Sequence, residues 1–236
     1  MVTEILKTYI PEHADALSEE QYAQLERYAE LLVEWNEKMN LTAITDPEGI
    51  AVKHFLDCLA YLKRANIPMG AKVADVGTGA GFPGVVLKIA RPDIKLVLID
   101  SLQKRLNFLG AVIDEIGIKA ELVHARAEDA GHDKNLRESF DVVTARAVAN
   151  LAVLSEYCLP LVKVGGVFAP MKTAEVPEEI ENARAAVKIL GGEIKAPDIY
   201  EIPIGGGRSV VFIEKKVSTP AKYPRQRVKI SEKPLK

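Results

Sequence analysis

The chain has 236 residues, of which 48% are hydrophobic and 27% charged, so it is long enough to bury a core and too apolar to be disordered throughout. No apolar run reaches the roughly 18–20 residues that span a bilayer, and the first residues lack the pattern of a signal peptide. The two cysteines, Cys58 and Cys158, fit neither a zinc spacing nor a disulfide framework. We therefore expect a soluble, cytoplasmic protein with no metal site and no membrane contact.

The net charge of −2 conceals an uneven distribution. Between Lys215 and Lys236 the sequence holds eight basic residues and one acid, whereas the remainder of the chain carries a net charge of −9. A basic segment of this kind binds polyanions through local phosphate contacts, and it is equally typical of a solvated terminus. The charge pattern alone leaves both interpretations open.

The first seventy residues have the pattern of helices. Ser18 and Gln21 fit a capping box, in which each side chain bonds the backbone N–H of the other residue. Behind the box, apolar residues recur at three- and four-residue steps, which predicts a long helix with one buried face: Tyr22, Leu25, Tyr28, Leu32, Trp35 and Met39. A second helical stretch runs from about Ile50 to Arg64. We expect residues 1–66 to form an N-terminal helical extension.

From residue 71 onward, short apolar runs alternate with helical segments, which predicts a parallel sheet. The five predicted strands cover residues 72–76, 95–100, 119–123, 140–145 and 166–171. After a helix near 178–190, two further strand-like runs, 193–203 and 209–215, have only Gly205–Arg208 between them. A crossover helix does not fit there, so this last pair must be antiparallel. We expect an α/β domain over 67–216 and a basic tail over 217–236.

The sharpest motif is the glycine-rich segment Asp75–Gly84, directly after the first predicted strand. Glycines allow a tight turn and a close approach of the backbone to a ligand. A dinucleotide-binding fingerprint requires glycine where Phe82 stands, and no Gly-Lys-Ser/Thr is present for a P-loop. The segment instead has an acid, Asp75, two residues before Gly-x-Gly-x-Gly, at the end of a predicted strand.

The next two strands also end in candidate ligand-binding residues. Asp100 stands at a strand's carboxyl end, where a carboxylate accepts hydrogen bonds from a ribose diol or caps the following helix. The segment Arg126–Asp129 follows the third strand, where a side chain or the backbone meets an adenine edge. Open α/β sheets bind ligands at these strand ends. The loops predict a nucleoside without phosphates, which points to S-adenosylmethionine.

The segment Thr144–Ala147, after the fourth strand, restricts the reaction. Enzymes that methylate exocyclic amines usually carry Asn/Asp-Pro-Pro-Tyr/Phe here, and this chain does not. Methylation of pyrimidine C5 needs a cysteine nucleophile, but Cys158 lies in an apolar helical run that predicts burial. We expect His54 to make a structural hydrogen bond. Guanine N7 carries a lone pair and no proton, so its methylation requires alignment of the reacting atoms rather than a base.

Several short motifs are more particular than the glycine loop. They are Trp35-Asn36, Asn40-Leu41-Thr42, His54-Phe55-Leu56-Asp57, Phe82-Pro83-Gly84, Asp100-Ser101, Lys104-Arg105, Arg126-Ala127-Glu128, Ala145-Arg146-Ala147 and Tyr223-Pro224-Arg225. Through them nearly the whole chain resembles the bacterial small-subunit ribosomal RNA guanine-N7 methyltransferases once called glucose-inhibited division protein B. The resemblance implies a class I, Rossmann-like, seven-stranded methyltransferase fold. It also implies methyl transfer from S-adenosylmethionine to N7 of a guanine in 16S ribosomal RNA, in a loop of the decoding region.

The resemblance and the strand-end positions together assign candidate residues to each role. The cofactor-binding candidates are Gly77, Gly79, Gly81, Phe82, Asp100, Ala127, Glu128 and Arg146. The catalytic candidates are Arg146, Lys172 and Arg126. The RNA-binding candidates, whose cations suit guanine O6 or phosphate, are Lys104, Arg105, Lys172, Arg208, Arg225 and Arg227.

The expected partner is 16S ribosomal RNA or the small-subunit particle, bound by a monomer. Two alternatives stay open. In the first alternative, the methyl acceptor is another RNA base or a small molecule. In the second, the chain is not an enzyme, and it senses the cofactor or docks RNA without turnover. The basic tail and the strand-end cations favour RNA over a small molecule.

Overall fold

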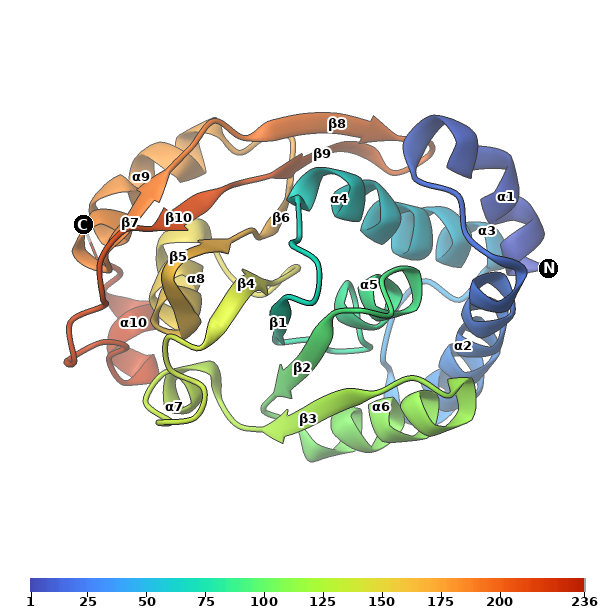
Figure 1. Cartoon of the computed structure of the whole chain (residues 1–236), viewed down its shortest axis with the longest axis horizontal. Helices are drawn as coiled ribbons and strands as arrows, with labels where there is room; N and C mark the ends of the chain where they lie inside the picture. Colours follow the sequence, from blue (N-terminus) through green and yellow to red (C-terminus); the bar gives the residue numbers. More distant parts are fainter. Residues whose placement is uncertain (236) are drawn as a thin grey trace.

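The main sheet places the strands that precede the candidate loops next to one another. In the computed structural model, which describes residues 1–235, seven strands follow the order β3-β2-β1-β4-β5-β10-β7 (Figure 1). Their bounds are β1 Lys72–Val76, β2 Lys95–Asp100, β3 Ala120–His124, β4 Phe140–Thr144, β5 Val162–Phe168, β7 Gly192–Ile194 and β10 Ile213–Lys215. The strands from β3 to β5 pair in parallel, whereas β10 pairs antiparallel with both of its neighbours. The predicted mostly parallel sheet with an antiparallel last strand is confirmed.

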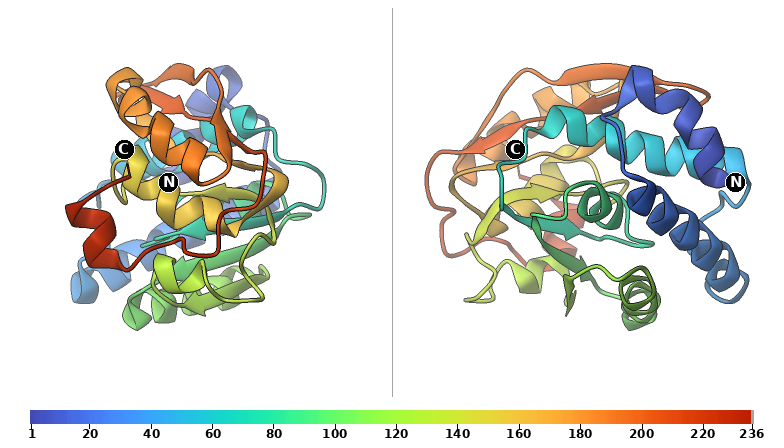
Figure 2. Two further views of the ribbon diagram at one scale, coloured as in Figure 1. Left: turned by 90° about the vertical axis from the view of Figure 1, so that its left-hand side faces the viewer. Right: turned by 45° about the vertical axis from the view of Figure 1, so that its right-hand side comes forward.

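Alternate side chains of the central strands enter two separate cores. Val73 and Leu98 join one core, and Ala74 and Ile99 join the other. Helices lie on both sides of the sheet (Figure 2). The first face is covered by α1 Val2–His13, α2 Glu19–Met39, α4 Asp57–Ala65, α5 Gly84–Ala90 and α6 Gln103–Ile116. The second is covered by α7 Ala127–Ala130, α8 Leu151–Cys158, α9 Pro177–Ile189 and α10 Arg227–Glu232.

The predicted capping box at the start of α2 is confirmed. The Ser18 hydroxyl accepts from the Gln21 N–H at 3.2 Å, and the Gln21 amide oxygen accepts from the Ser18 N–H at 2.8 Å. The second predicted helix is present, but its first half is a seven-residue π-helix, η1 Ile50–Leu56, which lies between α3 Pro47–Gly49 and α4. π-Helical turns are rare and concentrate at functional sites. This one carries His54.

The last two predicted strands each divide in two, which the sequence pattern did not indicate. Their inner halves, β7 and β10, complete the main sheet, whereas their outer halves form a second sheet that passes over α4 (Figure 1). This second sheet consists of β6 Met171–Thr173, β8 Asp198–Ile202 and β9 Gly206–Val210. Proline lacks the N–H that a sheet needs, so Pro197 separates β7 from β8 and Pro170 separates β5 from β6.

The basic C-terminal segment, residues 217–235, packs on the protein. Tyr223 and Ile230 are buried in the core that contains α8, and Ile230 belongs to the short helix α10. The solvated terminus that the charge pattern allowed is therefore not what the structure shows. Within residues 1–235, no helix combines the length and the apolar character needed to cross a membrane.

Candidate functional site

A cavity of about 310 Å³ opens where β1, β2 and β3 end. Seven of the predicted site residues line it: Gly77, Asp100, Arg105, Arg126, Ala127, Glu128 and Arg227. Val148 and Tyr157 line it as well, and neither had been predicted. The cavity therefore lies at the strand ends that the sequence indicated, and it has a further wall from α8 and α10.

Gly77 keeps this cavity open at the glycine loop. Its φ is +68°, a conformation that side chains disfavour, and a Cβ there would lie 2.8 Å from Cγ2 of Val148. The N–H groups of Gly77 and Thr78 both donate to the carbonyl of Ile99, at 2.9 and 3.2 Å. The loop is thereby fixed to β2 beside the cavity.

The acid that begins the motif holds the loop together from inside. Oδ2 of Asp75 accepts from the Thr78 hydroxyl at 2.7 Å and from the Gly84 N–H at 2.9 Å, and the side chain is fully buried. Burial raises the pKa of Asp75 to about 6, although both hydrogen bonds oppose that rise. Asp75 therefore shapes the loop and is not among the residues that line the cavity.

Asp100 presents a carboxylate at the cavity wall. Oδ1 accepts from the Leu102 N–H at 2.9 Å, Oδ2 accepts from the Gly79 N–H at 2.9 Å, and Arg105 lies 3.5 Å from Oδ2. A carboxylate has about four lone-pair sites, so at least one stays available to a ligand hydroxyl. Asp100 is therefore a buried acceptor at the cavity wall that suits a hydroxyl-bearing ligand.

Phe82 and Arg146 are not among the residues that line this cavity. The Phe82 ring stacks on His54 with centroids 4.4 Å apart, and the Arg146 guanidinium lies 4.8 Å from the Phe82 centroid. Nη2 of Arg146 donates to Nδ1 of His54 at 3.2 Å, and Nη1 lies 3.5 Å from the carboxylate of Asp57. The family motifs around these residues thus form one polar cluster beside the glycine loop.

His54 is neutral in this cluster. Arginine only donates, so Nδ1 accepts and the ring proton lies on Nε2, which is 3.0 Å from the hydroxyl of Thr42. Burial, and then the positive charge of Arg146, lower the pKa of His54 to about 3. The predicted structural hydrogen bond is present, and the imidazole is a weak base.

Asp57 joins the polar cluster to the second sheet. Arg146 approaches Oδ2 at 3.5 Å, and Arg208 from β9 approaches Oδ1 at 3.3 Å. Burial raises the pKa of Asp57, and both guanidinium groups oppose that rise. The same Arg208 side chain donates to the carbonyl of Gly205 at 2.6 Å. Arg208, an RNA-binding candidate, is therefore engaged inside the protein.

Two further candidates make internal contacts that the sequence did not indicate. The Lys172 ammonium donates to the carbonyl of Ala149 at 2.8 Å and to the carboxylate of Glu179 at 2.6 Å. The Arg225 guanidinium makes two bonds to the carboxylate of Glu156, at 2.8 and 2.7 Å. Both side chains have a structural role, and their predicted catalytic and RNA-binding roles stay predictions.

The remaining candidates differ in exposure. Lys104 lies exposed in the first turn of α6, and Arg126 precedes α7 at the cavity edge. Gly79 and Gly81 shape the loop without lining the cavity, and a Cβ at Gly81 would lie 2.7 Å from the hydroxyl of Tyr28. Tyr157, which no motif marked, lies in the apolar run that had been assigned to packing.

A family model described as GidB, rRNA small subunit methyltransferase G, matches residues 21–199. The chain belongs to this family. It is 49% identical to the ribosomal RNA small subunit methyltransferase G of Geobacillus thermodenitrificans over 92% of each chain. It is 45% identical to that of Staphylococcus carnosus over 100% of this chain and 99% of the relative. The resemblance drawn from the motifs is confirmed.

Solved structures of methyltransferases share the fold of this GidB-family chain. A methyltransferase from Pyrococcus furiosus is 15% identical with a TM-score of 0.56, over 81% of this chain and 98% of that one. A SAM-dependent methyltransferase from Aquifex aeolicus is 19% identical with a TM-score of 0.54, over 74% and 96%. The predicted methyltransferase fold is confirmed, and family and fold together indicate S-adenosylmethionine as the cofactor.

Proposed function

We propose that this chain transfers a methyl group from S-adenosylmethionine to N7 of a guanine in small-subunit ribosomal RNA. The observation that carries this function is the match of residues 21–199 to the family described as rRNA small subunit methyltransferase G. N7 as the acceptor atom is compatible with the cavity that bears Gly77 and Asp100, because among the described residues neither a cysteine nor a histidine lines it. Membership of the GidB family supports ribosomal RNA as the substrate.

The cavity residues have distinct parts in holding the cofactor. Asp100 accepts hydrogen bonds from the ribose diol, the backbone of Ala127 and Glu128 meets the adenine edge, and Gly77 leaves room for the chain that joins the sulfur to the sugar. When bound, S-adenosylmethionine supplies a methyl group made electrophilic by its sulfonium sulfur. Phe82 and Arg146 fix the glycine loop from outside the cavity.

The thiols and the imidazole of this chain are compatible with an acceptor atom that reacts without first losing a proton. Burial raises the pKa of both thiols, Cys58 and Cys158, so neither forms a thiolate readily. His54 is a weak base because its pKa is lowered to about 3. Guanine N7 offers a lone pair and carries no proton, so alignment in the site is sufficient.

The RNA-binding part of the proposal rests on charge beside the cavity. Arg105 and Arg126 line it, and Lys104 is exposed next to Arg105 in the sequence, where these cations can meet guanine O6 or phosphate. We place the catalytic domain at 67–216, between the helical extension and the C-terminal segment. The protein acts as a monomer in the cytoplasm.

The test is a methylation assay with labelled S-adenosylmethionine and three separate acceptor pools: small-subunit particles, naked ribosomal RNA and total small metabolites. Labelled RNA that is cleaved at the modified guanine by borohydride and aniline treatment supports N7. Label in RNA that resists cleavage indicates another base. If calorimetry shows that the cofactor binds but no label is transferred to any pool, the protein is a cofactor sensor or an RNA-docking protein and not an enzyme.

A further inference from the structure

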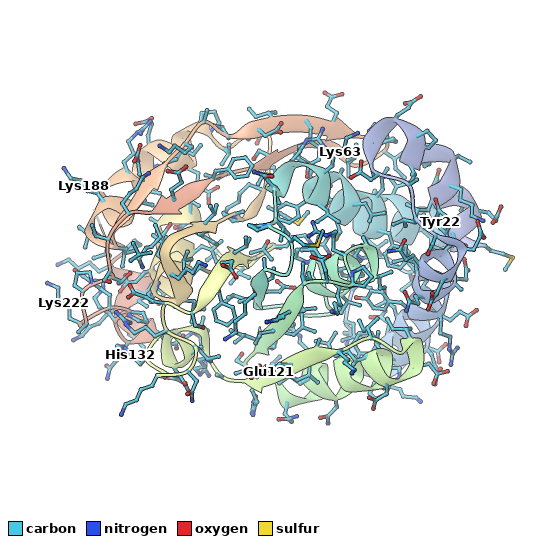
Figure 3. The ribbon with its side chains drawn as sticks, in the orientation of Figure 1. Tyr22, Lys63, Glu121, His132, Lys188 and Lys222 are labelled. Atoms are coloured by element: carbon cyan, nitrogen blue, oxygen red, sulfur yellow. The ribbon has the colours of Figure 1, made fainter. Side chains whose placement is uncertain are left out.

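The C-terminal segment is held on the body of the protein by side chains that bind its backbone. The Arg137 guanidinium donates to the carbonyls of Tyr223 at 2.9 Å and Thr219 at 2.8 Å. The ring of His132 bonds the carbonyl of Pro224 at 2.7 Å. In Figure 3, His132 and Lys222 lie at the same end of the molecule, where Figure 1 places α7 and α10. The path of the segment over this end is therefore fixed.

A buried carboxylate also anchors the segment. Glu156 in α8 has a side chain only 1% exposed, and it accepts three hydrogen bonds from Arg225. They come from the backbone N–H at 2.9 Å, Nε at 2.8 Å and Nη2 at 2.7 Å. A buried carboxylate without such partners is costly, because its desolvation is then uncompensated. The anchor thus sets the position of the residues that follow it.

Two residues beyond the anchor, Arg227 begins α10 and lines the 310 Å³ cavity. Glu128 and Tyr157 line the same cavity. The Glu128 carboxylate and the Arg227 guanidinium act in opposite directions on the pKa of Tyr157, which burial raises. Tyr157 itself follows Glu156 directly in α8, so one helix supplies both the anchor and part of the wall.

We propose that Arg227 binds the adenosine end of the cofactor and that Glu156 is a positioning residue that places it there. A guanidinium suits this role because it donates to ring nitrogens and stacks on flat aromatic faces. The proposal rests on the assignment of this cavity to S-adenosylmethionine. It gives the C-terminal segment a part in cofactor binding that is separate from any contact with RNA.

The experiment compares Arg227→Ala with Lys229→Ala, which removes the same charge from the same helix at an exposed residue outside the cavity. Affinities for S-adenosylhomocysteine are measured by calorimetry and those for adenosine by competition. Arg227→Ala should weaken both by about tenfold, the effect of one good hydrogen bond or stacking interaction, because both ligands contain the adenosine group. Lys229→Ala should leave both unchanged.

Glu156→Gln tests the positioning role in a double-mutant cycle. Alone it should weaken cofactor binding, whereas added to Arg227→Ala it should cause almost no further decrease, since the interaction that it positions is already absent. Wild-type affinity in Arg227→Ala overturns the inference and leaves the cavity assignment standing, and so does a decrease confined to RNA binding. A wild-type protein that does not bind the cofactor, or binds it unchanged when the cavity is blocked at Gly77, overturns the cavity assignment itself.

Discussion

The hydroxyl of Tyr28, in α2, donates a hydrogen bond to the carbonyl of Ala80, 52 residues further along the chain in the glycine loop. Tyr28 is fully buried, and its ring packs against that of Phe82 with centroids 5.4 Å apart. The next residue of the loop, Gly81, has no room for a Cβ beside the same hydroxyl. Helix α2 therefore helps to hold the glycine loop in place.

Replacing Tyr28 with Phe should weaken cofactor binding by about tenfold and lower the free energy of unfolding by about 1–2 kcal/mol, because the Ala80 carbonyl is then without its donor. Calorimetry and chemical denaturation measure the two effects. Tyr22→Phe on the same helix is the matched control and should change neither. Unchanged cofactor affinity in Tyr28→Phe would mean that α2 does not hold the loop.

Replacing Gly77 with Val should abolish cofactor binding. The new side chain would enter the cavity towards Val148, in addition to the backbone strain at a φ of +68°. Gly117→Val is the control, because Gly117 follows α6 with a φ of +69° and a Cβ there would have no other atom within 4 Å. Both variants should melt at lower temperature, and only the first should be unable to bind in calorimetry. Equal cofactor binding by the two variants would mean that the glycine loop is not part of the binding site.

Arg146→Ala should reduce turnover more than it reduces stability. The substitution removes the cation beside the Phe82 ring and the hydrogen bond to His54. Arg208 is then the one guanidinium that still pairs with Asp57. Arg208→Ala also removes one partner of Asp57, so the two variants should show similar decreases in the free energy of unfolding. Methylation rates and cofactor affinity should fall in the first, while cofactor affinity stays at the wild-type level in the second. The opposite ranking would give Arg146 a purely structural role.

His54 should make folding stability depend on pH. Its pKa is lowered from the usual 6.5 to about 3 in the folded protein, so the unfolded chain binds a proton that the folded one does not. Above pH 6.5 His54 adds no pH dependence, but protonation of the unfolded chain lowers the free energy of unfolding as the pH falls from 6.5 towards 3, by up to about 1.4 kcal/mol per pH unit. Denaturation of the wild type and of His54→Gln at pH 7, 6 and 5 should show a smaller decline in the variant. Parallel curves would contradict the prediction.

The exposed lysines of the C-terminal segment should contribute to the salt dependence of RNA binding. Replacing Lys222 and Lys233 with Ala leaves the Glu156 anchor intact and should lower the slope of log affinity against log salt by roughly 0.7–0.9 for each phosphate that is no longer neutralised. Lys63→Ala with Lys188→Ala removes the same charge from α4 and α9, at other places on the molecule in Figure 3. Filter binding at several salt concentrations would show the difference. Equal slopes in both double variants would mean that the segment does not bind phosphates.

Much of the fold could be predicted from short sequence patterns. The bounds of β1 and β2 match the predicted apolar runs, because buried parallel strands are apolar on both faces and end where their loops begin. The capping box was predicted for a similar reason, since its two hydrogen bonds join residues three positions apart. The cavity position followed from strand order, which brings together the carboxyl ends of neighbouring parallel strands.

Contacts between residues that are far apart in the sequence could not be predicted from such short patterns. Nothing near Glu156 in the sequence announces Arg225, and nothing near His54 indicates that its ring stacks on Phe82 and receives a hydrogen bond from Arg146. The π-helix was missed as well, because its residues share the apolar periodicity of an ordinary helix. Cations were therefore assigned to RNA from their charge and their positions near strand ends, although several are bound to acids or carbonyls inside the protein.

The pairing of Glu156 with Arg225 has a consequence for synthesis of the chain. The carboxylate meets its partner 69 residues later, after every strand of the main sheet has been made. A nascent chain that has emerged only as far as β10 contains the carboxylate of Glu156 in α8 but not yet Arg225, the residue that pairs with it in the core around α8. Completion of that core by Tyr223 and Ile230, and of the cavity wall by Arg227, therefore requires residues that are made after the last strand of the sheet.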